Sequence, residues 1–81
     1  MQYGIYIRHN NPMWSGLVEI LRYSGNVAFV NEEKRSFILL CPAKQDGKEW
    51  QRQNFARLST MLHPKQLFRV TVKDGVVKYL L

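Results

Sequence analysis

The stretch that decides the fold is DGKEWQRQNFARLSTML, residues 46–62. At about 100° per residue, its apolar side chains fall in one arc of a helix: Trp50, Phe55, Leu58, Met61 and Leu62. Asp46 is a typical N-cap, and Glu49 three residues later would complete a capping box. The pattern predicts one main amphipathic helix over residues 47–62.

This helix has a clear stop signal and needs an apolar surface to lie on. His63 precedes Pro64, and the residue before a proline avoids helical backbone angles. Most of the remaining chain is typical of β-strands, which would supply that surface.

Three segments before the helix have the pattern of strands. Residues 2–8 alternate, with Tyr3, Ile5 and Ile7 on one side. Residues 27–30 and 36–41 are rich in β-forming side chains and are joined by a polar loop, which indicates a hairpin. Residues 37–41 are apolar throughout, as expected of a central strand covered on both faces.

The end of the chain predicts a second hairpin, turning at Asp74-Gly75. Pairing outward from this turn sets Val72 opposite Val77, Val70 opposite Tyr79 and Phe68 opposite Leu81. These apolar pairs share one face, which we expect to pack against the main helix. The other face would then turn its polar side chains outward: Arg69, Thr71, Lys73 and Lys78.

Residues 13–23 fit two structures. Trp14, Leu17, Val18 and Leu21 form a helical stripe, but Gly16 lies inside it at a cost of about 1 kcal/mol relative to alanine. Residues 17–23 also fit a strand, which we slightly favour.

The choice at residues 13–23 sets the predicted fold, which is α+β in both cases. If residues 2–8 and 17–23 form one bent strand, the order is β-β-β-α-β-β, the element order of oligonucleotide-binding (OB) barrels, and we expect a small antiparallel barrel or sheet. If residues 13–23 form a helix, the alternative is a β-α-β-β-α-β-β sandwich with both helices on one face of an antiparallel sheet.

Size and composition indicate a single compact domain over residues 1–81. The start of the chain does not resemble a signal peptide, and no apolar run reaches the ~18 residues needed to span a bilayer. We therefore expect a cytoplasmic protein. The one cysteine, Cys41, ends an apolar run and is expected to be a buried, inert thiol.

The sequence offers little chemistry of the kind enzymes use. His9 and His63 have no carboxylate or second metal ligand at a useful spacing, and Glu32 and Glu33 would diverge on a loop. The five glycines are scattered and do not form a phosphate-binding loop. We expect no catalytic residues, no metal and no cofactor, and hence not an enzyme.

Charge points to a polyanionic partner. Twelve Lys and Arg against six Asp and Glu give a net charge of +6, which favours nucleic acid. Basic and aromatic side chains on a sheet suit single-stranded or structured nucleic acid, through phosphate contacts and base stacking. The candidate binding residues are Arg69, Lys73, Lys78, Tyr6, Arg8, Arg22, Tyr23 and Arg35, with Lys48 and Arg52 on the helix.

A second function class fits a small chain without catalytic chemistry. Met13 and Trp14 would form an apolar patch if their region were a loop, and tryptophan is enriched at the centres of interfaces. The alternative is therefore a protein–protein regulator or inhibitor that covers a partner surface. Such a protein could act as a homodimer.

Overall fold

The computed structural model describes residues 1–8, 14–23 and 25–80. Its elements follow the order β1 (Gln2–Arg8), α1 (Trp14–Leu21), β2 (Asn26–Asn31), β3 (Ser36–Leu40), α2 (Gly47–Leu58), the 3₁₀ turn η1 (Pro64–Gln66), β4 (Leu67–Lys73) and β5 (Val76–Tyr79). The α+β class is confirmed. The preferred order β-β-β-α-β-β is wrong, and the observed order is that of the alternative, β-α-β-β-α-β-β.

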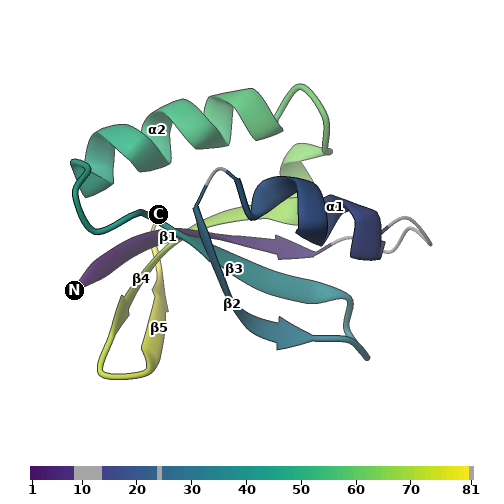
Figure 1. Ribbon diagram of the computed structural model, residues 1–81, viewed down its shortest axis with the longest axis horizontal. Helices are drawn as coiled ribbons and strands as arrows, with labels where there is room; N and C mark the ends of the chain where they lie inside the picture. The colour runs from purple at the N-terminus through teal and green to yellow at the C-terminus, as the bar shows by residue number, and fades with distance from the viewer. Residues whose placement is uncertain (9–13, 24, 81) are drawn as a thin grey trace.

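The five strands form one antiparallel sheet in the order β2-β3-β1-β4-β5. Since β3 lies between β1 and β2, the connectivity is the split β-α-β, or ferredoxin-like, arrangement, with β5 added beside β4. The sheet is open, with β2 and β5 at its edges, so the predicted barrel is not confirmed. Both helices lie on the same side of the sheet (Figure 1).

Residues 14–21 form helix α1, so the strand that we favoured over residues 17–23 is wrong. Leu17, Val18 and Leu21, three members of the helical stripe, are buried in the core. Gly16 is exposed and nothing crowds the position of its missing side chain. Burial of the stripe therefore outweighs the local β preference of the segment.

Helix α2 begins as predicted but ends one turn early. The Asp46 side chain accepts a hydrogen bond from the Glu49 backbone N–H at 3.1 Å, which confirms the N-cap. The hydroxyl of Ser59 donates to the carbonyl of Phe55 at 2.7 Å, and that of Thr60 donates to the carbonyl of Arg57 at 2.7 Å. Such side-chain bonds satisfy the last carbonyls and end the helix at Leu58. Met61, predicted in the apolar arc, is 57% exposed.

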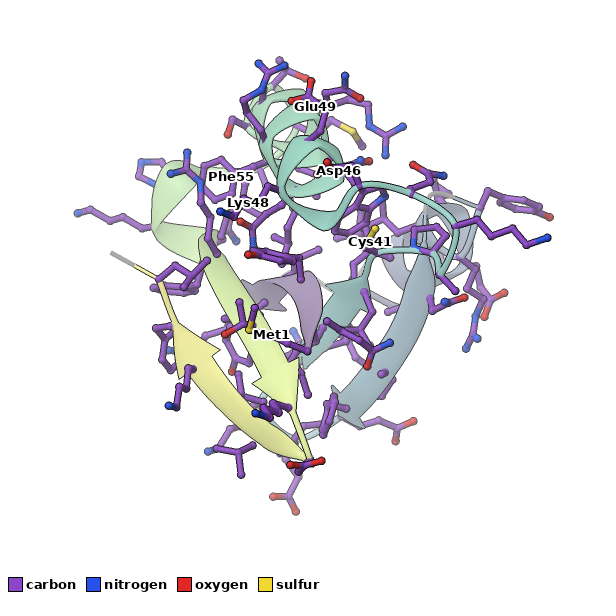
Figure 2. All side chains as sticks on the ribbon, turned by 90° about the vertical axis from the view of Figure 1, so that its left-hand side faces the viewer. Met1, Cys41, Asp46, Lys48, Glu49 and Phe55 are labelled. Atoms are coloured by element: carbon purple, nitrogen blue, oxygen red, sulfur yellow. The ribbon has the colours of Figure 1, made fainter. Side chains whose placement is uncertain are left out.

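Each face of the sheet carries its own apolar cluster. On the helix face, both helices pack on strand residues such as Ile5, Phe37 and Leu67. On the opposite face, which we call the far face, Ile38 and Leu40 of β3 pack with Val70 and Val72 of β4. Figure 2 shows the sheet bent into a V, with β4 and β5 in one arm and β2 in the other. The bend brings β3 and β4 side chains together, and β3 is buried along its whole length as predicted.

The last hairpin has the predicted register but the opposite orientation. Asp74 and Gly75 have positive φ angles of 51° and 77°, as a type I′ turn requires, and Val70 pairs with Tyr79 as predicted. The pair formed by Leu81 lies outside the described residues. Val70 and Val72, however, belong to the far face. Our expectation that this apolar side packs against α2 is therefore wrong, and Thr71 is buried on the helix face instead.

A buried glutamine attaches α2 to this polar side of β4. The side-chain nitrogen of Gln51 donates to the carbonyls of Gly4 at 2.8 Å and of Val70 at 3.0 Å. Gly4 and Val70 are paired across β1 and β4, so one amide holds two strands and the helix. Each carbonyl has a second lone pair to accept such a bond.

We expect Gln51→Glu to destabilise the protein by about 2–4 kcal/mol at pH 7, measured by urea unfolding. The substitution keeps the shape but replaces the donor by a carboxylate that faces two carbonyl oxygens. Burial would raise the pKa of that carboxyl in the folded state. The loss of unfolding free energy is therefore complete only at pH values well above about 4.3, and it shrinks as the pH falls and the carboxylate is protonated.

Gln45→Glu is the matched control, since Gln45 is exposed just before α2. We expect this change to stay within about 0.5 kcal/mol of the parent. Equal effects of the two substitutions would contradict the role assigned to Gln51.

Candidate functional site

Three aromatic rings meet on the far face, at the end away from the valine pair of β4. Tyr6 of β1, Phe68 of β4 and Tyr79 of β5 form what we call the aromatic cluster. The ring centroids lie 5.8 Å apart for Tyr6 and Phe68, 6.1 Å for Tyr6 and Tyr79, and 5.8 Å for Phe68 and Tyr79. The rings are tilted or edge-to-face, the arrangement that aromatic quadrupoles favour.

Strand pairing explains why these rings meet. Tyr6 is paired with Phe68 across β1 and β4, and Tyr79 is paired with Val70, two residues further along β4. Directly paired and diagonal neighbours on one sheet face are close enough for aromatic side chains to touch. The tight turn at Asp74-Gly75 fixes the register that brings Tyr79 into this group.

The aromatic cluster opens into a pocket of about 600 Å³, which we call the ring pocket. The pocket is lined by Tyr6, Arg8, Phe55, Leu67, Phe68, Arg69, Tyr79 and Leu80. Strand β5 ends at Tyr79, so Leu67 and Phe68 lie beyond its last paired residue. Side chains from both faces of β4 therefore reach the same pocket.

Two arginines flank the rings. The guanidinium carbon of Arg69 lies 4.5 Å from the centroid of the Phe55 ring, a cation–π contact between β4 and α2. Phe55 lies on the flank of α2 that faces β4, as does Lys48 (Figure 2). Arg8 follows Tyr6 on the far face, where it is exposed. Within residues 1–8, 14–23 and 25–80, neither Arg8 nor Arg69 forms an ion pair with a carboxylate.

The helix face of the last hairpin carries the basic stripe, formed by Arg69, Lys73 and Lys78. Arg69, Thr71 and Lys73 alternate along β4, and Lys78 is paired with Thr71. The predicted grouping of these cations therefore exists, on the side of the sheet opposite to the one we expected. Lys73 and Lys78 also line a smaller pocket of about 280 Å³ beside Thr71.

The structure thus brings together six of the ten predicted nucleic-acid contacts on or beside β4 and β5: Arg69, Lys73, Lys78, Tyr6, Arg8 and Lys48. The other four lie elsewhere. Arg22 pairs with Glu19 at 3.2 Å, and the neighbouring Tyr23 is 94% exposed.

Arg52 hydrogen-bonds to Glu49 on the outer side of α2. This bond lowers the pKa of the Glu49 carboxyl and raises the pKa of the Arg52 guanidinium. Arg35 lies at the end of the β2–β3 turn, with a positive φ of 50°. These positions are separate from the lining of the ring pocket.

The predicted protein interface falls at the start of α1. Met13 lies outside the described residues. Trp14 is half-buried and packs against the helix-face cluster rather than standing out as a loop anchor. Its indole nitrogen is buried and has no hydrogen-bond partner among the residues that the structure describes.

Sequence reasoning missed Phe55, Phe68 and Tyr79 as site residues. The sequence pattern instead predicts Phe68 and Tyr79 in the core, on one face with Val70 and Val77, and Phe55 in the apolar arc that contains Trp50. The signal that could have found them is Gly4. A glycine in the middle of an alternating strand often marks a close approach of neighbouring groups, and it leaves Tyr6 as the bulky side chain on its side of β1.

Other kinds of site are not found in the described part of the chain. Residues 1–8, 14–23 and 25–80 hold no group of three or more His, Cys, Asp or Glu that could bind a metal ion. No helix among these residues is long and apolar enough to cross a membrane.

Cys41 is buried below the first turn of α2, as predicted, and its sulfur lies 3.3 Å from the carbonyl oxygen of Pro42. Burial, and secondly the negative charge of Asp46, raise the pKa of the thiol.

Comparisons with protein-family models, with curated proteins and with solved structures find no match to this chain.

Because Cys41 is buried and the pKa of its thiol is raised, we expect it to react with a disulfide reagent at pH 8 more slowly than the same thiol in urea-unfolded protein. Asp46→Asn keeps a capping side chain but removes the nearby charge, so it should speed the reaction of the folded protein. Equal rates for folded and unfolded protein would contradict the burial of this thiol.

Proposed function

We propose that this protein binds single-stranded nucleic acid at the ring pocket, with bases stacked on the aromatic cluster and phosphates held by Arg8 and the basic stripe. The observation that carries the proposal is the meeting of three aromatic rings and two arginines in one pocket. Exposed rings beside a basic groove are the common means by which sheets hold unpaired strands.

The exposure of the rings supports stacking by a ligand. Tyr79 is 59% exposed, and Tyr6 and Phe68 are half-buried, so part of each ring remains open. Each ring also contacts the other two in a tilted or edge-to-face arrangement, which restricts its movement before a base binds. A pre-positioned ring loses little conformational freedom on binding.

The charge around the pocket supports a polyanion rather than a cation as the ligand. The side chains that line the ring pocket include two arginines and no carboxylate. Aromatic groups of this kind can also bind ammonium ions, but Arg8 and Arg69 would repel them. The net charge of +6 adds long-range attraction for phosphates.

The lysines of the basic stripe extend this positive surface along the hairpin. Arg69 and Lys73 are four residues apart on β4, which corresponds to about 13 Å of strand. A short length of nucleic-acid backbone that follows β5 would therefore meet Arg69, Lys78 and Lys73 in turn.

We expect binding of a labelled eight-residue single strand of DNA or RNA at ~50 mM salt, measured by fluorescence anisotropy. With contacts from Arg8, Arg69, Lys73 and Lys78, the logarithm of the affinity should fall with the logarithm of salt with a slope of about −3. Loss of a stacking ring in Tyr79→Ala should weaken binding about tenfold.

Tyr23→Ala is the matched control, because Tyr23 is an exposed tyrosine outside the pocket. It should bind like the parent. Undetectable binding at ~50 mM salt would overturn the proposed function, and equal weakening by Tyr79→Ala and Tyr23→Ala would overturn the proposed site.

A further inference from the structure

The contact between Arg69 and Phe55 positions a guanidinium group in the ring pocket before any ligand binds. Phe55 comes from α2 and Arg69 from β4, and both side chains line the pocket. The guanidinium carbon lies 4.5 Å from the centroid of the half-buried Phe55 ring, and this cation–π contact holds the group against the ring. A planar group held in this way presents a fixed fork of N–H donors, whereas a lysine would present a mobile point charge.

The hydrogen-bonding groups that line the pocket are mostly donors. Arg8 and Arg69 can only donate, and the hydroxyls of Tyr6 and Tyr79 can donate or accept. The remaining lining side chains are apolar, and none is a carboxylate or an amide. A base that offers adjacent acceptors to this pocket leaves fewer of its polar groups unpaired than a base that offers an amine.

Guanine is the base that meets this requirement. Its O6 and N7 are two neighbouring acceptors on one edge, and a bidentate arginine is their most common partner. Adenine presents an amine beside N7, cytosine presents an amine, and thymine or uracil presents a single carbonyl on the corresponding edge.

We propose that the ring pocket prefers a guanine base: when guanine occupies the pocket, Arg69 donates to its O6 and N7 in place of a phosphate, Tyr79 stacks on the ring, and Arg8, Lys73 and Lys78 hold the phosphates. This inference rests on the proposed function, because it names the base that the same site takes. Phe55 is then a positioning residue that acts through Arg69.

The test compares eight-residue thymidine oligonucleotides in which one central base is guanine, adenine, cytosine, hypoxanthine or 7-deazaguanine. Hypoxanthine keeps O6 and N7, and 7-deazaguanine lacks N7. We expect guanine and hypoxanthine to bind about tenfold tighter than the other three. Equal affinity for all five overturns the guanine preference but leaves the proposed function standing, whereas no binding to any of them overturns both.

Two variants distinguish the bidentate donor geometry of Arg69 from its positive charge. Arg69→Lys should keep most of the affinity for plain thymidine and lose the guanine preference, because the charge stays and the bidentate geometry does not. Phe55→Leu should reduce the preference in the same direction by releasing Arg69. Arg22→Lys, at an arginine outside the pocket, should keep the preference. A full guanine preference in Arg69→Lys overturns the inference.

Discussion

Side chains of β3 and β4 meet across Gly4 on the far face. This contact decides which half of that face is buried and which half leaves aromatic rings exposed. A Cβ at Gly4 would lie 3.0 Å from Ile38 Cγ2, 3.0 Å from Leu40 Cδ2 and 3.1 Å from the carbonyl oxygen of Leu39. The missing side chain therefore gives Ile38 and Leu40 room to reach Val70 and Val72 over the central strand. The sheet bends to close this half of the far face, so the exposed rings are confined to the other half.

The same bend explains why polar residues of β4 face a helix. Successive side chains of a strand point to opposite faces of the sheet. Because Val70 and Val72 lie on the far face, Arg69, Thr71 and Lys73 point toward the helix face. Two side chains of α2 contact this side of β4. Gln51 donates hydrogen bonds to strand carbonyls, and the Phe55 ring makes a cation–π contact with the Arg69 guanidinium. The features that position the candidate site are thus consequences of how β4 is oriented.

Local signals predicted the five observed strands, although the same reasoning also favoured a strand over residues 17–23, where the structure has helix α1. The Asp74-Gly75 turn sets the register of the last hairpin, the apolar run of residues 37–41 marks β3 as an interior strand buried on both faces, and Asp46 starts α2. Each of these depends on residues close in sequence. Helix α2 ends before the predicted residue 62, at the point where the hydroxyls of Ser59 and Thr60 donate to the carbonyls of Phe55 and Arg57.

The orientation of β4 could not be predicted in the same way. Either face of the last hairpin could pack on a helix, and the more apolar face was the reasonable choice. The deciding contacts, Gln51 with Val70 and Arg69 with Phe55, join residues 19 and 14 positions apart, and the contact across Gly4 joins three strands. The aromatic cluster follows from these long-range contacts, so its residues were individually visible in the sequence but their meeting was not.

The contact across Gly4 can be measured directly by nuclear Overhauser spectroscopy on protein with labelled isoleucine, leucine and valine methyl groups. We expect cross-peaks between the methyls of Ile38 or Leu40 and those of Val70 or Val72, since these side chains form one buried cluster. A spectrum in which the valine methyls instead contact Trp50 or Leu58 of α2 would contradict the orientation of β4, and with it the position of the ring pocket.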